Sequence, residues 1–228
     1  MARAFDVSEK TIHRWVKERQ LPAFRDGSWL RFSREEVLEW AAMQRLPLSP
    51  QFLAAAENDA SPLPTLAEAL TAGGVHYGVE GADKQSVLRA VVNRLRLPPS
   101  INRDWLWALL WARESLESTA VGEGVAIPHP RHPIVLDLAR PLVSLCFLRQ
   151  PVDFGALDGQ PVFALFLLIS PTVKVHLHLL ARLAYGLRDA RLKALLSARA
   201  GEQDLLAAVA ATEAGLAAAR NTPPAKKL

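Results

Sequence analysis

The chain has 228 residues, a formal net charge of +4 at pH 7 and one cysteine; half of its residues are hydrophobic and 22% are charged. This length can form one large domain or two smaller ones, and this balance is typical of a globular protein. The single Cys146 excludes a disulfide framework and is predicted to be a buried thiol. The sequence shows neither the roughly 20 successive apolar residues of a membrane span nor the apolar core of a signal peptide. We therefore expect a cytoplasmic protein with no membrane segment.

The first part of the chain predicts a basic, amphipathic helix. Ser8 is a suitable N-cap for a helix over Glu9–Arg19, on which Ile12, Trp15 and Val16 share the inward face. Positive side chains lie mostly on the opposite face and in the segment that follows: Lys10, Arg14, Lys17, Arg19, Arg25, Arg31 and Arg34. Such a local excess of positive charge attracts a polyanion.

The neighbouring residues predict further elements of a small domain. Residues 2–5 resemble the end of an earlier helix. Asp26-Gly27 between two alternating runs predicts a β-hairpin. Ser33 and Glu36 form a capping box for another helix, whose apolar members are Val37, Leu38 and Trp40.

This order of elements, with the run Val7-Ser-Glu-Lys-Thr-Ile-His-Arg-Trp-Val16 and the run Trp29-Leu-Arg-Phe32, resembles the excisionase-like, MerR-related winged helix-turn-helix domains. The resemblance implies that the second helix enters the DNA major groove and that the wing contacts phosphates. By position, it implies DNA contacts from Lys10, Thr11, Arg14, Lys17, Arg25 and Arg31. By the same resemblance, residues 2–5 are expected to correspond to the tail of the family's first helix. A small interaction domain with a solvated basic face is the alternative.

Residues 46–64 predict a linker. They combine several prolines with few large apolar residues, which is the composition of a semi-rigid spacer. We therefore place the winged helix-turn-helix at residues 1–45, a second domain at 65–220 and a polar tail at 221–228.

The second domain alternates helices with apolar strands, which predicts an α/β fold. Thr65, Asp83 and Asn102 are expected to cap its first helices. The expected helices are 66–73, Lys84–Arg96, Arg103–Leu116, Val173–Leu187, Leu192–Ser197 and Gln203–Ala219. The expected strands are Val75–Val79, Thr119–Ile127, Pro141–Leu148 and Pro161–Ile169, of which the last two are apolar enough to be buried on both faces.

His129 stands between Pro128 and Pro130, directly after an apolar run. Prolines do not fit inside a helix, so His129 is expected on a loop at the end of a strand. A loop stiffened by proline would present the imidazole to solvent in a fixed direction. A phosphoryl-accepting or ligand-binding histidine needs such a position, and a plain loop histidine is the alternative.

Several short motifs of the second domain follow one another in a fixed order: Arg113-Glu114, Ser118-Thr119, Gly122-x-Gly124-Val-Ala-Ile-Pro-His129, Pro151-Val-Asp-Phe154, Asp158-Gly-Gln-Pro-Val162 and His176-Leu-x-x-Leu180. The series resembles the fructose/mannitol-type EIIA domain of the bacterial phosphotransferase system, a class that includes the nitrogen-regulatory branch. The resemblance covers essentially all of residues 65–220 and implies a mixed sheet flanked by helices. It also implies that His129 accepts a phosphoryl group from a phosphohistidine carrier protein (HPr- or NPr-like), with His176 and Arg113 lining the same pocket.

The implied chemistry explains these residue types. A neutral imidazole can attack phosphorus in line, and the Arg113 guanidinium offers a forked donor to phosphate oxygens. His176 can donate a hydrogen bond to the same oxygens, and no metal or cofactor is required. Alternatively, Arg113 pairs with a glutamate on the helix surface. His178 lies two residues from His176 on the same helix, so it points elsewhere and is expected to be packed or solvated.

Other constellations are weaker. His129 and His132 have a His-x-x-His spacing, but without helical geometry or nearby cysteines this is a poor zinc motif. Asp153 and Asp158 could form a catalytic carboxylate pair, yet their neighbouring glycines favour turns. Pro130 stands where relatives of this type are expected to carry a small, flexible residue.

These features favour a regulatory phosphoryl-carrier protein over an enzyme that turns over a small molecule. The sequence contains no EIIB or EIIC segment, so we expect regulation rather than sugar uptake, with a separate EIIB or regulatory protein as a further partner. The alternative is a DNA-binding transcription regulator whose EIIA-like domain senses phosphorylation state.

Overall fold

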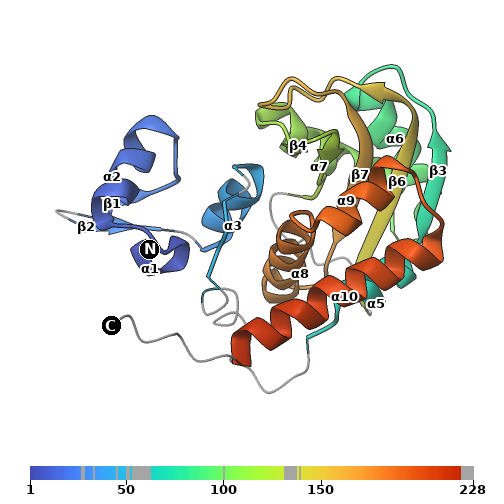
Figure 1. Cartoon of the computed structure of the whole chain (residues 1–228). Helices are drawn as coiled ribbons and strands as arrows, with labels where there is room; N and C mark the ends of the chain where they lie inside the picture. The colour runs from blue at the N-terminus through green and yellow to red at the C-terminus, as the bar shows by residue number, and fades with distance from the viewer. Residues whose placement is uncertain are drawn as a thin grey trace.

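The computed structural model describes residues 1–26, 29–32, 34–44, 46–49, 52, 63–99, 101–130, 138 and 140–221. They form a small N-terminal unit and a larger α/β unit (Figure 1). Several sequence interpretations lie outside these residues: the Gly27 turn, the Ser33 cap, most of the linker, His132 and the tail after residue 221. The domain boundaries therefore stay a prediction.

The N-terminal unit has the predicted order of elements. It comprises helices α1 (Ala2–Phe5), α2 (Glu9–Glu18) and α3 (Arg34–Met43) and strands β1 (Phe24–Asp26) and β2 (Trp29–Arg31). The strands pair in an antiparallel hairpin, with Phe24 opposite Arg31. Ser8 caps α2 as expected, because its hydroxyl accepts a hydrogen bond from the Thr11 backbone N–H at 3.2 Å.

Three aromatic side chains hold this unit together. Phe5 of α1 packs edge-on against Trp15 of α2 and Trp40 of α3, with ring centroids 5.2 and 5.8 Å apart. The Trp40 indole N–H also donates to the Arg19 carbonyl oxygen at 2.8 Å. Such aromatic pairs contribute about 0.5–1.5 kcal/mol each beyond their buried area. The short α1 is therefore fixed to both of the other helices.

The α/β unit contains the remaining described elements. Its helices are α5 (Leu66–Gly73), α6 (Lys84–Arg94), α7 (Arg103–Leu116), α8 (Val173–Gly186), α9 (Ala190–Ser197) and α10 (Glu202–Asn221). Its strands are β3 (Val75–Val79), β4 (Ala120–Gly122), β5 (Val125–Ala126), β6 (Leu142–Val152) and β7 (Val162–Ile169). The side chains of Thr65, Asp83 and Asn102 cap α5, α6 and α7, which confirms the predicted helix starts.

Several predicted boundaries were wrong. The expected strand Thr119–Ile127 is instead the two short antiparallel strands β4 and β5, because Glu123 and Gly124 turn the chain with φ angles of 50° and 73°. Helix α6 ends at Arg94, where Leu95 is already extended. Strand β6 runs on to Val152, since its last residues pair again with β7.

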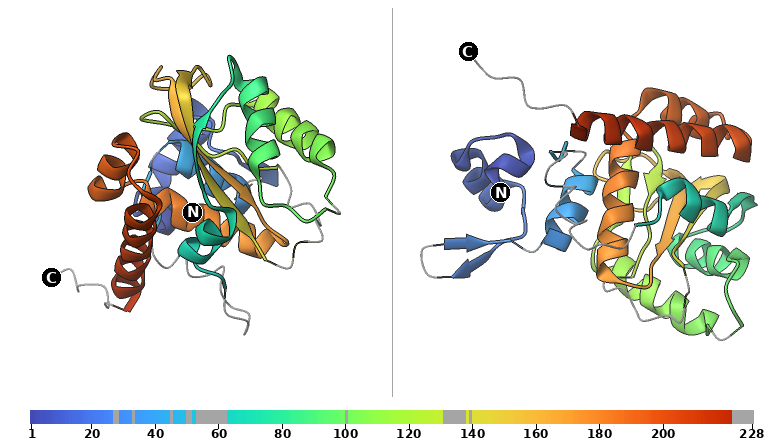
Figure 2. Two further views of the ribbon diagram at one scale, coloured as in Figure 1. Left: turned by 90° about the vertical axis from the view of Figure 1, so that its right-hand side faces the viewer. Right: turned by 90° about the horizontal axis from the view of Figure 1, so that it is seen from below.

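The strands of the described α/β unit form a mixed sheet in the order β3-β6-β7-β5-β4. The β3/β6 and β5/β7 pairs are parallel, and the β6/β7 and β4/β5 pairs are antiparallel. Helices α6 and α7 cover one face, and α5, α8, α9 and α10 cover the other (Figure 2). This three-layer arrangement confirms the predicted α/β fold with a mixed sheet flanked by helices.

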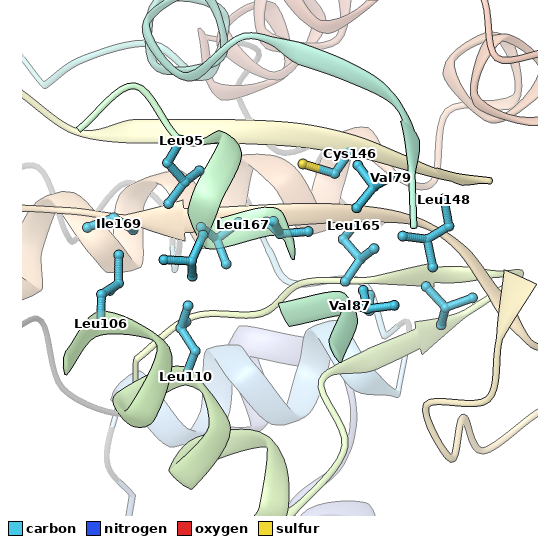
Figure 3. Close-up of a cluster of buried hydrophobic side chains, with 14 of the residues drawn as sticks. Val79, Val87, Leu95, Leu106, Leu110, Cys146, Leu148, Leu165, Leu167 and Ile169 are labelled. Atoms are coloured by element: carbon cyan, nitrogen blue, oxygen red, sulfur yellow. The ribbon is translucent and has the colours of Figure 1, made fainter. Parts of the chain in front are cut away.

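Alternate residues of the central strands fill the two cores, as a strand with both faces buried requires. On β6, Cys146 and Leu148 point into the core shared with α6 and α7 (Figure 3). Leu145 and Phe147 belong to the core on the other face of the sheet. Cys146 is fully buried, which confirms the prediction. Burial raises the pKa of its thiol to about 12.

The two units meet through α3, which lies against α8 and β4 (Figure 1). Leu38 of α3 is 2% exposed and packs in one cluster with Leu177 and Ala181 of α8 and Leu216 of α10. Within the described residues, none of the helices combines the length and the apolar character that crossing a membrane needs.

Candidate functional site

Two histidines from different elements lie side by side in the α/β unit. His129 follows β5, and His176 lies in the first turn of α8, which Thr172 caps by accepting from the Val175 N–H at 3.2 Å. Their ring centroids are 5.2 Å apart and the rings are tilted by 48°. The cap and the strand end therefore bring together two of the three residues that the sequence placed in one pocket.

Hydrogen bonds to backbone carbonyls fix the position of His129. Its Nδ1 lies 2.7 Å from the Ile127 carbonyl oxygen. Because a carbonyl oxygen only accepts, Nδ1 carries a hydrogen, and in the neutral ring the lone pair is then on Nε2. The loop itself is held to the sheet, since the Leu168 N–H donates to the Pro128 carbonyl at 3.1 Å.

The expectation that His129 faces solvent was wrong. His129 is 4% exposed and His176 is 1% exposed. Pro128 and Pro130 are buried as well, because the Pro128 carbonyl pairs with Leu168 of β7 and the loop lies along the sheet instead of projecting from it. In this conformation, a second protein cannot reach the ring without a movement of the elements around it.

His176 has a polar neighbour on its Nδ1 side. The hydroxyl of Ser170, which follows β7 directly, lies 3.3 Å from that nitrogen. Ser170 is itself 3% exposed, so the contact is sheltered from water. The end of β7 and the start of α8 thus fix the His176 ring beside His129.

Arg113 lies in the last turn of α7 and is buried, not on the helix surface. Its Nη1 donates to the backbone carbonyl of Glu117 at 2.8 Å, and its positive charge acts to lower the pKa of the neighbouring Glu114 carboxyl. The role of Arg113 in binding phosphate stays a prediction.

Glu114, the next residue, is 2% exposed. One of its oxygens accepts from both the backbone N–H and the hydroxyl of Thr119, at 3.1 and 2.5 Å. Burial raises the pKa of the Glu114 carboxyl, although the hydrogen bonds from Thr119 and the positive charge of Lys84 act in the opposite direction. Thr119 also accepts from the Ile127 N–H at 3.0 Å, so Glu114 is tied to the strand that leads to His129.

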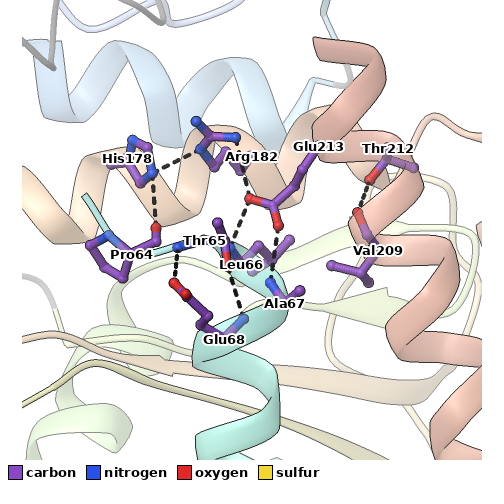
Figure 4. Close-up of polar contacts among 10 residues, drawn as sticks. All are labelled: Pro64, Thr65, Leu66, Ala67, Glu68, His178, Arg182, Val209, Thr212 and Glu213. Carbon is purple, nitrogen blue, oxygen red and sulfur yellow. Dashed lines mark hydrogen bonds and ion pairs between the residues drawn. The ribbon is translucent and has the colours of Figure 1, made fainter. Parts of the chain in front are cut away.

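His178 lies on another side of α8, in a buried polar network that sequence reasoning missed (Figure 4). Its Nε2 is 3.0 Å from the Pro64 carbonyl oxygen and 2.8 Å from Nε of Arg182. Arg182 pairs with Glu213 of α10 at 3.2 Å. The Glu213 carboxylate accepts from the first backbone N–H groups of α5, those of Leu66 and Ala67, at 2.8 and 3.0 Å. This His178 network joins α5, α8 and α10, and its role is structural.

The carboxylates of Asp153 and Asp158 form turns, as their glycine neighbours indicated. Asp153 accepts from the Gly155 N–H at 2.7 Å, and Asp158 accepts from the N–H groups of Gln160 and Glu123 at 3.1 and 2.7 Å. Among the residues that the structure describes, no three histidine, cysteine or acidic side chains gather as metal ligands would. The hypothesis of a zinc site involving His132 lies outside that part of the chain.

The basic residues of α2 occupy one solvent-facing side of the N-terminal unit. Lys10, Arg14 and Lys17 are exposed and recur at helical spacing. Thr11 is half-buried, and its hydroxyl lies 2.9 Å from that of Ser8, within the cap. Arg31 is exposed on β2, and the side chain of Arg25 lies outside the described residues.

Comparisons with known families agree with this architecture. The family model "Phosphoenolpyruvate-dependent sugar phosphotransferase system, EIIA 2" matches residues 68–211, and a "Helix-turn-helix domain" model matches residues 1–45. The nitrogen regulatory protein of Pseudomonas aeruginosa is 38% identical over 122 residues, which are 52% of this chain and 77% of that protein. The nitrogen regulatory protein of Escherichia coli K12 is 30% identical over 145 residues, which are 63% and 85% of the two chains.

Solved structures give the same result for the α/β unit. The crystal structure of nitrogen regulatory protein IIA-Ntr from Neisseria meningitidis aligns with a TM-score of 0.56 at 28% identity, over 63% of this chain and 98% of that one. The IIA-mannitol structure from E. coli, solved with phosphorylated enzyme IIB-mannitol, aligns with a TM-score of 0.52 over 60% of this chain and 94% of that one. At 18% identity, that second likeness shows the fold alone.

Proposed function

The chain belongs to the EIIA 2 family of the phosphoenolpyruvate-dependent sugar phosphotransferase system, and from this premise we propose that His129 accepts a phosphoryl group from a phosphohistidine carrier protein of the HPr or NPr type. The observation that carries the proposal is the His129–His176 pair. The two ring centroids are 5.2 Å apart, and Nδ1 of His129 is hydrogen-bonded to the Ile127 carbonyl oxygen. The similarity to nitrogen regulatory proteins supports a regulatory role over sugar transport.

The hydrogen bond of His129 supports Nε2 as the reacting nitrogen. Since Nδ1–H donates to the Ile127 carbonyl at 2.7 Å, Nε2 of the neutral ring holds the nucleophilic lone pair. Nε2 attacks the phosphorus of the carrier's phosphohistidine as the carrier's own P–N bond breaks. The electron pair of that bond returns to the carrier imidazole, and the phosphoryl group ends on Nε2.

Nearby groups then stabilise the transferred charge. A phosphoryl group brings about −1.5 to −2 charges to the site. We assign to His176 a hydrogen bond to a phosphoryl oxygen, and its ring centroid 5.2 Å from that of His129 supports this role. Arg113 follows the family motif and is the cation that we assign to the same oxygens.

Intact mass of the full chain, before and after incubation with the upstream phosphotransferase enzymes and phosphoenolpyruvate, tests the proposal. We expect one added phosphoryl group on the wild type and none on His129→Ala. His13→Ala is a matched control, because His13 is exposed on α2, far along the sequence from the site. An unmodified wild type, in a reaction where a control EIIA protein is phosphorylated, would refute the proposal.

A second function is supported by the N-terminal unit, which matches a helix-turn-helix family model and exposes Lys10, Arg14 and Lys17 on one side of α2. We propose that this side binds DNA phosphates and that the wing residues Arg25 and Arg31 add to it, so that the chain regulates transcription in response to phosphorylation.

Salt-dependent DNA binding tests this second function. Each lost phosphate contact should weaken binding and reduce the dependence on salt by about one unit of the logarithmic slope. We expect this from Arg14→Ala and Lys17→Ala, but not from Arg191→Ala, which removes an exposed arginine of α9. Binding that is absent, or equally affected by all three substitutions, would argue against it.

A further inference from the structure

Helix α3 has two apolar sides. Val37, Trp40 and Ala41 pack into the core of the N-terminal unit. Leu38 is absent from that core, and it instead packs against Leu177 and Ala181 of α8. Successive residues of a helix point about 100° apart, so Leu38 faces away from the side of α3 that carries Val37. Besides Leu38, the buried members of its cluster come from the α/β unit, and the partly buried Leu48 and Phe52 pack against the same cluster.

The surface that α3 occupies borders the histidine pair. Leu177 directly follows His176 in the first turns of α8. Helix α3 also contacts β4, whose hairpin partner β5 leads into His129. Figures 1 and 2 both show α3 between the rest of the N-terminal unit and α8. The surface of α8 and β4 that contacts α3 is therefore next to the buried imidazoles of His129 and His176.

A pocket that is partly open to solvent lies beside this contact. It has a volume of about 250 Å³ and lies between Ala41 with residues 46–48 on one side and the β4–β5 hairpin, α8 and α9 on the other. Interfaces between domains of one chain resemble transient protein–protein interfaces, and relative movement is expected unless the interface is large and hydrophobic. The contact between the two units thus has the features of a separable interface.

We propose that the face formed by α8 and β4 is a docking surface on which α3 of the same chain competes with the phosphoryl donor. The inference rests on the proposed function of His129. The donor must bring its phosphorus to about 3–3.5 Å from the nucleophilic nitrogen, and α3 packs on Leu177, the residue next to His176. Docked α3 therefore occupies surface that a donor at His129 needs, and Leu38 is the α3 residue in that contact.

Linkage makes the effect reciprocal. If docked α3 excludes the donor and the phosphoryl group, then phosphorylated His129 disfavours docking by the same factor. The phosphorylated chain releases its helix-turn-helix unit from the α/β unit. The basic side of α2 stays exposed in the docked form, so docking controls where this unit lies and not whether its basic side is covered.

The initial rate of phosphorylation of full-length variants tests the inference. Leu38→Ala removes the contact from α3 and spares the core of the N-terminal unit, and Ala181→Glu places a charge on the opposite side of the same contact. Ala211→Glu is the matched control, because it makes the same change on an exposed face of α10. If the docked form is favoured about tenfold, both interface variants should react up to roughly 10-fold faster than the wild type and Ala211→Glu should not.

Hydrogen exchange provides a second readout that does not depend on the variants. In the phosphorylated wild type, the amides of residues 34–43 and 177–185 should exchange faster than in the unmodified chain. Thermal unfolding of each variant establishes that it is folded.

The outcomes separate the two proposals. Unchanged rates in both folded interface variants, with normal phosphorylation of the wild type, would overturn the docking inference and leave the function of His129 standing. Slower rates in the folded variants would also overturn it, because α3 would then assist the donor. If neither wild type nor variants are phosphorylated, the function of His129 itself fails.

Discussion

The rings of His129 and His176 lie with centroids 5.2 Å apart, although one residue follows strand β5 and the other lies in the first turn of helix α8, far along the sequence. Each ring has a polar partner at Nδ1, which is the Ile127 carbonyl oxygen for His129 and the Ser170 hydroxyl for His176. The Nδ1 side of each ring thus faces a group of the protein itself, and the proposed transfer uses Nε2 of His129.

Removal of the second imidazole should slow phosphoryl transfer. His176→Ala is expected to lower the rate of His129 phosphorylation by roughly 10²-fold, the usual effect of losing a hydrogen-bond donor to a developing negative charge. His176→Gln, which keeps a donor, should retain more of the rate. Rapid-quench measurement compares these rates with that of His76→Ala. His76 is a suitable control because it lies in β3 and its ring contacts the Gly73 carbonyl oxygen. Equal rates for all three variants would contradict the assigned role of His176.

The His178 network should contribute to stability and not to transfer. Glu213→Ala leaves Arg182 without its carboxylate partner and removes the acceptor for two N–H groups at the start of α5. We expect the free energy of unfolding to fall by about 3–5 kcal/mol. Urea titration measures it against Glu202→Ala, which removes an exposed carboxylate of the same helix. A similar loss in both variants would show that burial of the Glu213 pair is not the cause.

Glu114 should make stability depend on pH. Burial raises the pKa of this carboxyl in the folded chain above its ordinary value of 4.5. Its contribution to stability is therefore fully present below pH 4.5 and is lost as pH rises through the folded-state pKa. The side chain in Glu114→Gln has no acidic proton to lose. The wild type should therefore lose stability relative to this variant as the pH rises from 4.5 to 7. Urea titrations across this range test the sign, and a relative stability that grows with pH would contradict it.

Cys146 reports on the integrity of the central sheet. Its thiol is fully buried, and burial raises its pKa to about 12, so almost no thiolate is present near neutral pH. A colorimetric thiol reagent should therefore not react with the native chain and should react with one thiol per chain in denaturant. Rapid reaction of the native protein would contradict the placement of β6 between the two helical layers.

Local signals predicted much of this fold. The capping side chains of Thr65, Asp83 and Asn102 mark helix starts by contacts within three residues, and these starts were correct. The hairpin of β4 and β5 was missed because it depends on Glu123 adopting a positive φ of 50°, which a non-glycine residue seldom does.

Long-range contacts were beyond the sequence patterns. Glu213 pairs with backbone groups 146 and 147 positions away, and nothing in its own segment indicates them. The burial of His129 likewise depends on how its loop lies along β7 and on the elements packed around the site. The proline pattern predicted a loop correctly, but the direction of the imidazole is set by tertiary packing.

Nitrogen-15 NMR of the histidine-labelled full chain after phosphorylation tests the central claim most directly, because each ring nitrogen gives its own signal. The account predicts a phosphorus coupling on Nε2 of His129 alone, with its Nδ1 still protonated. A phosphoryl group on another histidine, or no phosphorylated imidazole under conditions that modify a control EIIA protein, would contradict it.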